Sequence, residues 1–323
     1  ELAAKLNVSL GTANGLVKEC MGRGYIAERT EGEDGFRYGS KWELKEEGRR
    51  LLEQYKVDGA LIIAAGFGSR FVPLTFETPK GLLEVFGERM IERQIKQLHE
   101  VGITDITIAV GYLKEKFEYL IDKYQVKLLY NPEYATKNTL TTIYRARQVL
   151  AGKNMYILSS DNWLRNNMFH AYECGAWYAS SYMEGDTSEW CLSYNKKGRI
   201  THVEVGGHDS WVMYGPVFFS RTFSEKFLPL LERYYHTPGT EQFYWENVLV
   251  EHLDELEMDI NRQPENQIYE FENLEELRRF DPRYQNHSDN TALELVSRVF
   301  ELPESEIHDI RCLKSGMTNK SFL

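Results

Sequence analysis

An uninterrupted apolar run that passes directly into a glycine-rich loop is the feature that most constrains the fold of this chain. Residues 60–64 have the sequence ALIIA, and residues 65–70 have the sequence AGFGSR. A continuous apolar run of this length is typical of a strand buried on both faces of a parallel sheet. Glycines after such a strand let backbone N–H groups approach a phosphate chain, because no Cβ stands in the way. The sequence therefore predicts an α/β domain that binds phosphate at the end of this strand.

Two cationic side chains, Arg70 and Lys80, follow the glycines, and Pro73 and Pro79 stiffen the segment between them. A dinucleotide-binding fingerprint requires a third glycine that this loop lacks, and a Walker A loop requires a Gly-Lys-Ser/Thr ending that is absent. A turn-forming glycine loop with surface charges is the alternative. The pairing of glycines with two cations favours phosphate binding.

Helical and strand patterns alternate after this loop, at residues 91–102, 103–112, 113–124 and 126–131. Repeated strand and helix units imply a mainly parallel sheet with helices on both faces. In such sheets, ligands bind at the carboxyl ends of the strands. Gly111, Tyr112 and Asn131 fall at such ends, as the glycine loop does.

A further strand, at residues 155–158, runs into Ser159-Ser160-Asp161-Asn162. A carboxylate at the carboxyl end of a strand, near a phosphate loop, is well placed to hold Mg²⁺. The alternative is that Asp161 caps a following helix. Since one protein carboxylate holds Mg²⁺ weakly, we expect a second, and the best candidate is Glu246.

Aromatic residues make up 13% of the chain, and several lie beside glutamates in its later part. A quaternary ammonium group cannot donate hydrogen bonds, so ring faces and carboxylates hold it, at about 0.5–2 kcal/mol per cation–π contact. The alternative for any one ring is a place in the core or on a strand, and a sugar pocket also stays open. The residues that predict a cationic pocket are Glu189, Trp190, Tyr214, Tyr244, Trp245 and Glu270.

The pattern AGxGSRxxPLTxxxPK at residues 65–80 resembles the signature of nucleotidyltransferases that make sugar nucleotides and CDP-alcohols. Together with VGYLKEKFEYL, SSDN, SEWCLSY and YWEN, in this order, it resembles the bacterial CTP:phosphocholine cytidylyltransferases. The resemblance spans about residues 58–282. It implies a Rossmann-like nucleotidyltransferase sheet and the conversion of CTP and phosphocholine to CDP-choline and pyrophosphate.

The resemblance also implies roles for individual residues. Lys80, Arg70 and Asp161 would be catalytic, and Asp161 and Glu246 would hold Mg²⁺, although the family has Asp where this chain has Glu246. The nucleotide would contact Ala64, Ala65, Gly66, Phe67, Gly68, Ser69, Arg70, Gly111, Tyr112 and Asn138. Phosphocholine would contact Glu189, Trp190, Tyr214, Tyr244, Trp245 and Glu270.

Residues 1–57 predict a separate domain. A Ser9-capped helix, a turn, an alternating strand and a final helix resemble the winged helix-turn-helix domains of bacterial regulators. Such a domain would contact DNA, and the alternative is a regulatory or dimerisation module that does not. The residues that would contact DNA are Gly11, Thr12, Asn14, Arg37 and Lys41.

Residues 285–323 follow the nucleotidyltransferase domain predicted at 58–284. The polar stretch 285–290 predicts a linker, and residues 291–300 predict a helix. The sequence GMTNKSF, at 316–322, resembles the first nucleotide loop of choline-kinase-like enzymes, and the alternative is an unrelated hairpin. The resemblance implies the truncated start of a choline-kinase-like domain.

Net charge and composition limit the classes of partner that the chain can bind. Of 38 basic and 49 acidic residues, ten of each lie in residues 1–56, so the rest of the chain carries the whole net charge of −11. An acidic body disfavours polyanions and suits a cationic ligand. No run approaches the ~18 apolar residues of a membrane helix. The four scattered cysteines fit a reducing cytoplasm.

Two other functions stay open. A sugar-1-phosphate nucleotidyltransferase shares the glycine loop and the metal carboxylate but differs in its acceptor pocket. A DNA-binding regulator would sense nucleotides through an inactive enzyme domain, although the retention of Arg70, Lys80, Asp161 and Glu246 disfavours it. The sequence also leaves a homodimer open.

Overall fold

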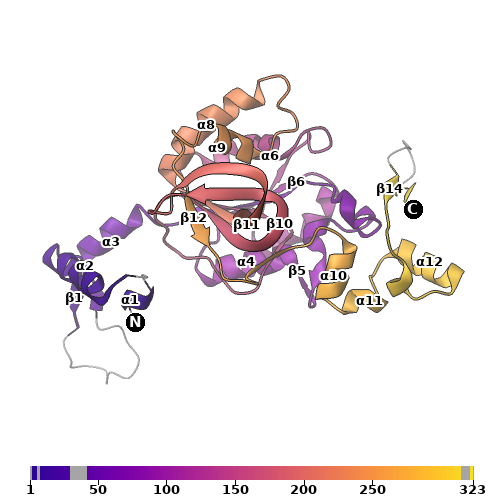
Figure 1. Ribbon diagram of the computed structural model, residues 1–323, viewed down its shortest axis with the longest axis horizontal. Helices are drawn as coiled ribbons and strands as arrows, with labels where there is room; N and C mark the ends of the chain where they lie inside the picture. Colours follow the sequence, from indigo (N-terminus) through magenta and orange to yellow (C-terminus); the bar gives the residue numbers. More distant parts are fainter. Residues whose placement is uncertain (1, 6–7, 30–41, 314–320, 323) are drawn as a thin grey trace. The chain divides into compact units, whose positions relative to one another are not determined.

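The computed structural model describes residues 2–5, 8–29, 42–313 and 321–322 (Figure 1). Contacts between residues divide the chain into two compact units, Glu1–Lys56 and Val57–Leu323. Within the described residues, no helix is both long enough and apolar enough to cross a membrane.

The first unit contains three helices and one pair of strands in its described part. They are α1 (Leu2–Lys5), α2 (Leu10–Gly22), β1 (Ile26–Glu28), β2 (Trp42–Leu44) and α3 (Glu46–Glu53). Ser9 caps α2 as the sequence predicts, since its Oγ accepts a hydrogen bond from the Thr12 N–H at 3.0 Å. β1 and β2 pair antiparallel. Arg37 and Lys41 lie outside the described residues, and the winged-helix assignment stays a prediction.

The second unit is built on a seven-stranded sheet with the order β12-β10-β11-β8-β3-β6-β7. The apolar run forms β3 (Gly59–Ala64), which pairs in parallel with β6 (Ile106–Val110) and with β8 (Met155–Ser159). β6 pairs in parallel with β7 (Lys127–Tyr130). The mainly parallel α/β sheet that the sequence predicts is therefore confirmed, and the carboxyl ends of β3, β6 and β8 lie at one edge.

Helices cover both faces of this sheet, because alternate residues of β3 point to opposite sides. Leu61 belongs to one apolar cluster and Ile62 to another. The first cluster includes side chains of α6 (Thr139–Arg145), α8 (Arg221–Tyr235) and α9 (Trp245–Glu251). The second includes side chains of α4 (Met90–Glu100) and α5 (Tyr119–Tyr124). Figure 1 shows α4 on the side of the sheet opposite α8 and α9.

The other part of the sheet is a long antiparallel hairpin of β10 (Trp177–Tyr194) and β11 (Ile200–Phe219), and β11 pairs antiparallel with β8. Its register shifts at several points, and Gly185 adopts a φ of +77° while its N–H donates to Asp209 Oδ1. Such bulges bend and twist a ribbon. The hairpin therefore curls, as Figure 1 shows, and β12 (Asp259–Arg262) lines its outer edge in parallel with β10.

Shorter elements complete the second unit. They are η1 (Ser69–Phe71), η2 (Leu74–Phe76), η3 (Lys80–Leu82), β4 (Glu84–Val85), β5 (Glu88–Arg89), η4 (Lys114–Phe117), α7 (Arg147–Leu150), β9 (Asn162–Leu164), β13 (Ile268–Glu270), α10 (Leu274–Phe280), α11 (Arg283–Asn286), α12 (Thr291–Phe300), η5 (Glu304–Glu306), β14 (Cys312–Leu313) and β15 (Ser321–Phe322). β9 pairs with β13, and β14 pairs with β15.

Of two helices expected from the sequence, one is present as a single helix and the other is divided. The helix expected at residues 291–300 is confirmed as α12. The helix expected at 113–124 is instead split into η4 and α5, and it starts from Leu113, which has a φ of +47°. A left-handed residue cannot be part of an α-helix, so the helical pattern begins one residue later and as a tighter turn.

Candidate active site

A cavity of about 540 Å³ lies at the carboxyl ends of β3 and β8 and reaches the hairpin and the start of α9. Its lining combines segments that are far apart in the sequence. The residues predicted from the sequence that line it are Ala64, Gly66, Gly68, Arg70, Lys80, Asp161, Glu189, Trp190, Tyr244, Trp245, Glu246 and Glu270. The predicted phosphate loop, metal carboxylates and ring cluster therefore face one space.

The glycine loop forms one wall. Gly68 has a φ of +66°, and a Cβ at this position would lie 2.9 Å from Thr75 Cγ2, so only glycine fits without strain. The Thr75 hydroxyl donates to the Gly68 carbonyl at 2.9 Å and fixes the turn. At Gly66, a Cβ would meet nothing within 4 Å, so the backbone there is open to a ligand.

Lys80 and Asp161 form an ion pair across the cavity, with 2.6 Å between Nζ and Oδ2. Burial alone would raise the pKa of Asp161, but the charge and the hydrogen bond of Lys80 outweigh it and hold that pKa below its usual value. Asp161 precedes strand β9 and not a helix, so the alternative of a helix cap is wrong. The pair places one cation and one carboxylate beside the loop.

Two glutamates, Glu246 and Glu270, lie on the same cavity without a basic partner among the described residues. Tyr178 donates to Glu246 Oε1 at 3.1 Å, whereas Glu246 Oε2 is buried and has no hydrogen-bond partner in the described part of the chain. Burial raises the pKa of Glu246 to about 7. Burial, with the nearby charge of Asp161, raises the pKa of Glu270 to about 7. Buried carboxylates of this kind are stabilised by a bound cation.

Glu270 interacts with both predicted metal ligands, Asp161 and Glu246. Glu270 receives a hydrogen bond from Asn162, the residue after Asp161, and it interacts with the charges of both Asp161 and Glu246. Asp161 and Glu246 thus share one cavity, and Glu270 is the carboxylate that interacts with both.

The ring cluster has an accessible part and a buried part. Trp190 and Tyr244 meet edge to face with their centroids 6.2 Å apart, and Tyr244 is 48% exposed. Trp245 is only 3% exposed and packs against Phe219 in the core, although it also lines the cavity. Trp190 and Tyr244 are therefore the rings best able to receive a ligand, and Trp245 supports them.

Several residues predicted to bind nucleotide lie beside the cavity and do not line it. They are Ala65, Phe67, Ser69, Gly111, Tyr112 and Asn138. The Tyr112 N–H donates to the Ala65 carbonyl at 3.1 Å, and a Cβ at Gly111 would lie 2.6 Å from that oxygen. The end of β6 is therefore packed tightly against the glycine loop.

Asn138 and Tyr214 have other visible contacts. Asn138 caps α6, since its Oδ1 accepts from the Thr139 N–H, and its Nδ2 donates to the Gln242 carbonyl. The Tyr214 hydroxyl accepts from the Glu270 N–H at 2.9 Å and does not line the cavity. Their roles as cytosine and phosphocholine contacts stay predictions, and the contacts show that each also holds a neighbouring part of the site.

Tyr178 and Glu272 are among the cavity residues that sequence reasoning missed. Tyr178 stacks on Trp245 at 5.9 Å between centroids and binds Glu246, but in the sequence it looks like any strand aromatic. Glu272 forms an ion pair with Arg70 of the glycine loop. Its only signal was its position two residues after Glu270.

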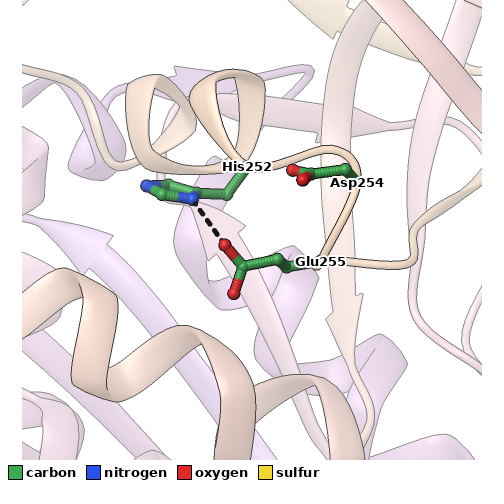
Figure 2. A group of neighbouring side chains, drawn as sticks. All are labelled: His252, Asp254 and Glu255. Atoms are coloured by element: carbon green, nitrogen blue, oxygen red, sulfur yellow. Dashed lines mark hydrogen bonds and ion pairs between the residues drawn. The ribbon is translucent and has the colours of Figure 1, made fainter.

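His252, Asp254 and Glu255 form a separate cluster after α9, with ligand atoms within 4.8 Å of one another (Figure 2). His252 Nδ1 lies 3.2 Å from Glu255, but its Nε2 lies 3.1 Å from the Arg233 guanidinium. Since that cation already stands next to the histidine, no metal is assigned to the cluster.

Comparison with known proteins agrees with this geometry. The family of nucleotidyl transferases matches residues 59–180. Choline-phosphate cytidylyltransferase of Streptococcus pneumoniae is 34% identical over 229 residues, which cover 71% of this chain and 99% of that protein. The 2-aminoethylphosphonate cytidylyltransferase of Lancefieldella rimae is 35% identical over 227 residues, which cover 70% of this chain and 92% of that protein.

A solved structure of the CTP:phosphocholine cytidylyltransferase from Streptococcus pneumoniae aligns with a TM-score of 0.67 and 35% identity. The alignment covers 70% of this chain and 98% of that one. Sequence and fold therefore match almost the full length of these relatives. The chain belongs to the cytidylyltransferases of the nucleotidyltransferase family.

Proposed function

We propose that this enzyme transfers the cytidylyl group of CTP to phosphocholine and releases pyrophosphate. The observation that carries the proposal is the single cavity in which a glycine loop, the Lys80–Asp161 pair and an accessible ring cluster with neighbouring glutamates face one another. The first two features suit a nucleoside triphosphate, and the third suits a cationic acceptor.

In the proposed reaction, a phosphate oxygen of phosphocholine forms a bond to the α-phosphorus of CTP. The bond from that phosphorus to the bridging oxygen breaks, and pyrophosphate leaves with the electron pair. The attacking oxygen is already ionised near neutral pH, so no general base is required. Catalysis then consists of positioning and of neutralising charge.

Different residues of the cavity would position the substrates and neutralise their charge. The backbone of Ala65–Ser69 and the Arg70 guanidinium would hold the triphosphate and favour the departure of pyrophosphate. Arg70 pairs with Glu272 in this structure, so it would exchange that carboxylate for phosphate oxygens. Lys80 would stand beside the α-phosphate, where its ammonium can offset the negative charge that builds up in the transition state.

Mg²⁺ fits the carboxylates of the cavity. The unpartnered Oε2 of Glu246 and the raised pKa of Glu246 and Glu270 indicate room for a cation, and carboxylate oxygens are the ligands that Mg²⁺ prefers. Asp161 and Glu246 would hold it. When bound, the ion would neutralise charge on the substrate phosphates.

The acceptor's head group would lie against the rings of Trp190 and Tyr244, with Glu189 and Glu270 nearby. Ring faces attract a trimethylammonium group, which cannot donate hydrogen bonds. A primary ammonium could in addition donate to the carboxylate of Glu189 or Glu270, so the acceptor of the relative named for 2-aminoethylphosphonate is the second candidate.

A pyrophosphate-release assay with a panel of substrates tests the proposal. CTP with phosphocholine should give the highest kcat/KM, above CTP with 2-aminoethylphosphonate or phosphoethanolamine. UTP or dTTP with glucose 1-phosphate represents the sugar-nucleotide alternative. Higher kcat/KM with a sugar phosphate would refute the proposal, and higher kcat/KM with 2-aminoethylphosphonate would replace its acceptor.

For the two flanking segments we propose the roles that the sequence suggests. The first unit would be a winged helix that contacts DNA, and a gel-shift titration with increasing salt would test it, because phosphate contacts weaken steeply with salt. Residues after 290 would begin a choline-kinase-like domain, which would supply phosphocholine. Phosphorylation of choline by a longer chain that contains residues 291–323 would test that role.

A further inference from the structure

We propose that residues 281–293 form a brace that positions Lys80, by holding both ends of the segment at residues 73–86. The segment carries Pro79, Lys80 and Gly81 into the active-site cavity. The sequence predicts only a linker at 285–290. The proposal rests on the role of Lys80 proposed above and adds residues to that function that lie outside the cavity.

The brace holds the first end of the segment through buried and exposed contacts. Asn290 is 1% exposed, and its Nδ2 donates to the Pro73 carbonyl at 3.3 Å. The Thr291 N–H and hydroxyl both lie 3.3 Å from Glu77 Oε2. Leu293 is fully buried in the apolar cluster that contains Leu74.

The second end is held in the same way. The Tyr284 hydroxyl donates to the Glu84 carbonyl at 2.7 Å, and the Phe86 N–H donates to Asp281 Oδ2 at 2.6 Å. Both side chains are almost fully buried. Buried hydrogen bonds of this kind are expensive to lose, because the groups left behind find no water.

The middle of the segment has contacts of its own, since Leu82 and Leu83 are each 5% exposed and a Cβ at Gly81 would lie 2.5 Å from Ser160 Oγ. A second cavity, of about 530 Å³, lies behind it, and Thr78, Leu82 and Leu83 line that cavity together with residues of the brace. The segment therefore forms a thin wall between two cavities. The surface that faces the second cavity gains no packing contacts there, so the ties at the two ends add to the packing of Gly81, Leu82 and Leu83 in fixing the backbone beneath Lys80.

The position of Lys80 matters because catalysis here depends on placement. A displacement of about 1 Å can reduce a rate by roughly 100-fold. Loss of the ties should let the segment move toward the second cavity and withdraw the Lys80 ammonium from its place beside Asp161. The brace residues act through Lys80, so they are positioning residues and touch no substrate.

Two substitutions each remove one tie, one at each end of the segment, and keep the surrounding fold. Tyr284→Phe removes only the hydroxyl that binds Glu84. Asn290→Ser keeps an acceptor for the Leu293 N–H, and so the cap of α12, but is too short to reach Pro73. Tyr234→Phe is the matched control, because it removes a hydroxyl that binds Glu251, outside the segment.

The double variant Tyr284→Phe/Asn290→Ser should lower kcat by about tenfold, while KM for CTP and for phosphocholine stays within about twofold and Tyr234→Phe keeps the wild-type kcat. If the double variant fails to fold, the kcat of the single variant Tyr284→Phe tests the brace instead. The same substitutions in a Lys80→Ala background, followed in single turnovers, should lower the rate no further, because the group they position is gone. An equal loss in both backgrounds, or an unchanged kcat in the first, would overturn the brace. Pyrophosphate release by the wild-type enzyme with CTP and phosphocholine tests the proposed function independently of the brace.

Discussion

The two sides of the active-site cavity are built in different ways. The phosphate side comes mostly from a short stretch of chain, since the glycine loop, Arg70 and Lys80 lie within about twenty residues of β3, and Asp161 joins them from the segment after β8. The acceptor side is assembled from Tyr178 and Trp190 on the hairpin, Tyr244 and Glu246 at α9, and Glu270 on β13. A phosphate chain is bound largely by backbone geometry, which a local motif can encode, whereas a cationic head group needs side chains from several directions.

The comparison predicts that substitutions on the phosphate side slow the chemical step, whereas substitutions on the acceptor side weaken the binding of phosphocholine. The largest effect is expected from Asp161→Asn, which removes both the partner of Lys80 and a proposed metal ligand. Its kcat for pyrophosphate release should fall by roughly 1,000-fold or more, with an unchanged melting temperature. Asp58→Asn, at the opposite end of β3, is the control and should keep its kcat within about twofold.

Lys80→Ala should lower kcat by roughly 100-fold, because a cation aimed at the reacting phosphate acts mainly in the transition state. KM for CTP should change much less, since the backbone of the glycine loop and Arg70 still bind the triphosphate. Initial-rate kinetics with CTP as the varied substrate measure both constants. A rise in KM with an intact kcat would instead make Lys80 a group that binds substrate and transition state equally.

Substitutions of Glu246 and Glu270 test where the metal site ends and the acceptor pocket begins. Glu246→Gln should raise the Mg²⁺ concentration for half-maximal activity by about tenfold, as expected for a weakened metal site. Glu270→Gln should act mainly on KM for phosphocholine. Magnesium titrations at saturating substrates compare the two variants. If Glu270→Gln shifts the magnesium curve more, then Glu270, whose charge interacts with Asp161, is the second ligand in place of Glu246.

The smallest effect is expected from Trp190→Ala. Loss of one ring from the head-group pocket should raise KM for phosphocholine by about fivefold, because a cation–π contact contributes about 1 kcal/mol. KM for CTP should not change. Trp211→Ala is the control, since this ring pairs with Tyr182 on the hairpin and does not line the cavity. An equal rise in both KM values would remove Trp190 from the acceptor side.

The sequence predicted the parallel sheet because β3, β6 and β8 are buried on both faces and therefore appear as continuous apolar runs. It also singled out Lys80, Asp161, Glu246 and Trp190, which all line one cavity. It did not single out Tyr178, whose surroundings in the chain are those of an ordinary strand. It also gave no sign that Glu272 would pair with Arg70 across about two hundred residues of chain.

The sequence by itself determined the phosphate loop, since the glycines and the strand before them are adjacent and their backbone geometry is a local property. Only the tertiary structure decided which rings are accessible: Tyr244 is exposed and Trp245, its neighbour in sequence, is buried. The tertiary structure also includes the polar stretch at 285–290 in the compact unit that contains Lys80, where Asn290 donates a hydrogen bond to the Pro73 carbonyl. The physical reason is that burial and contact between distant segments depend on how the helices and the curled hairpin pack, and no local pattern specifies that packing.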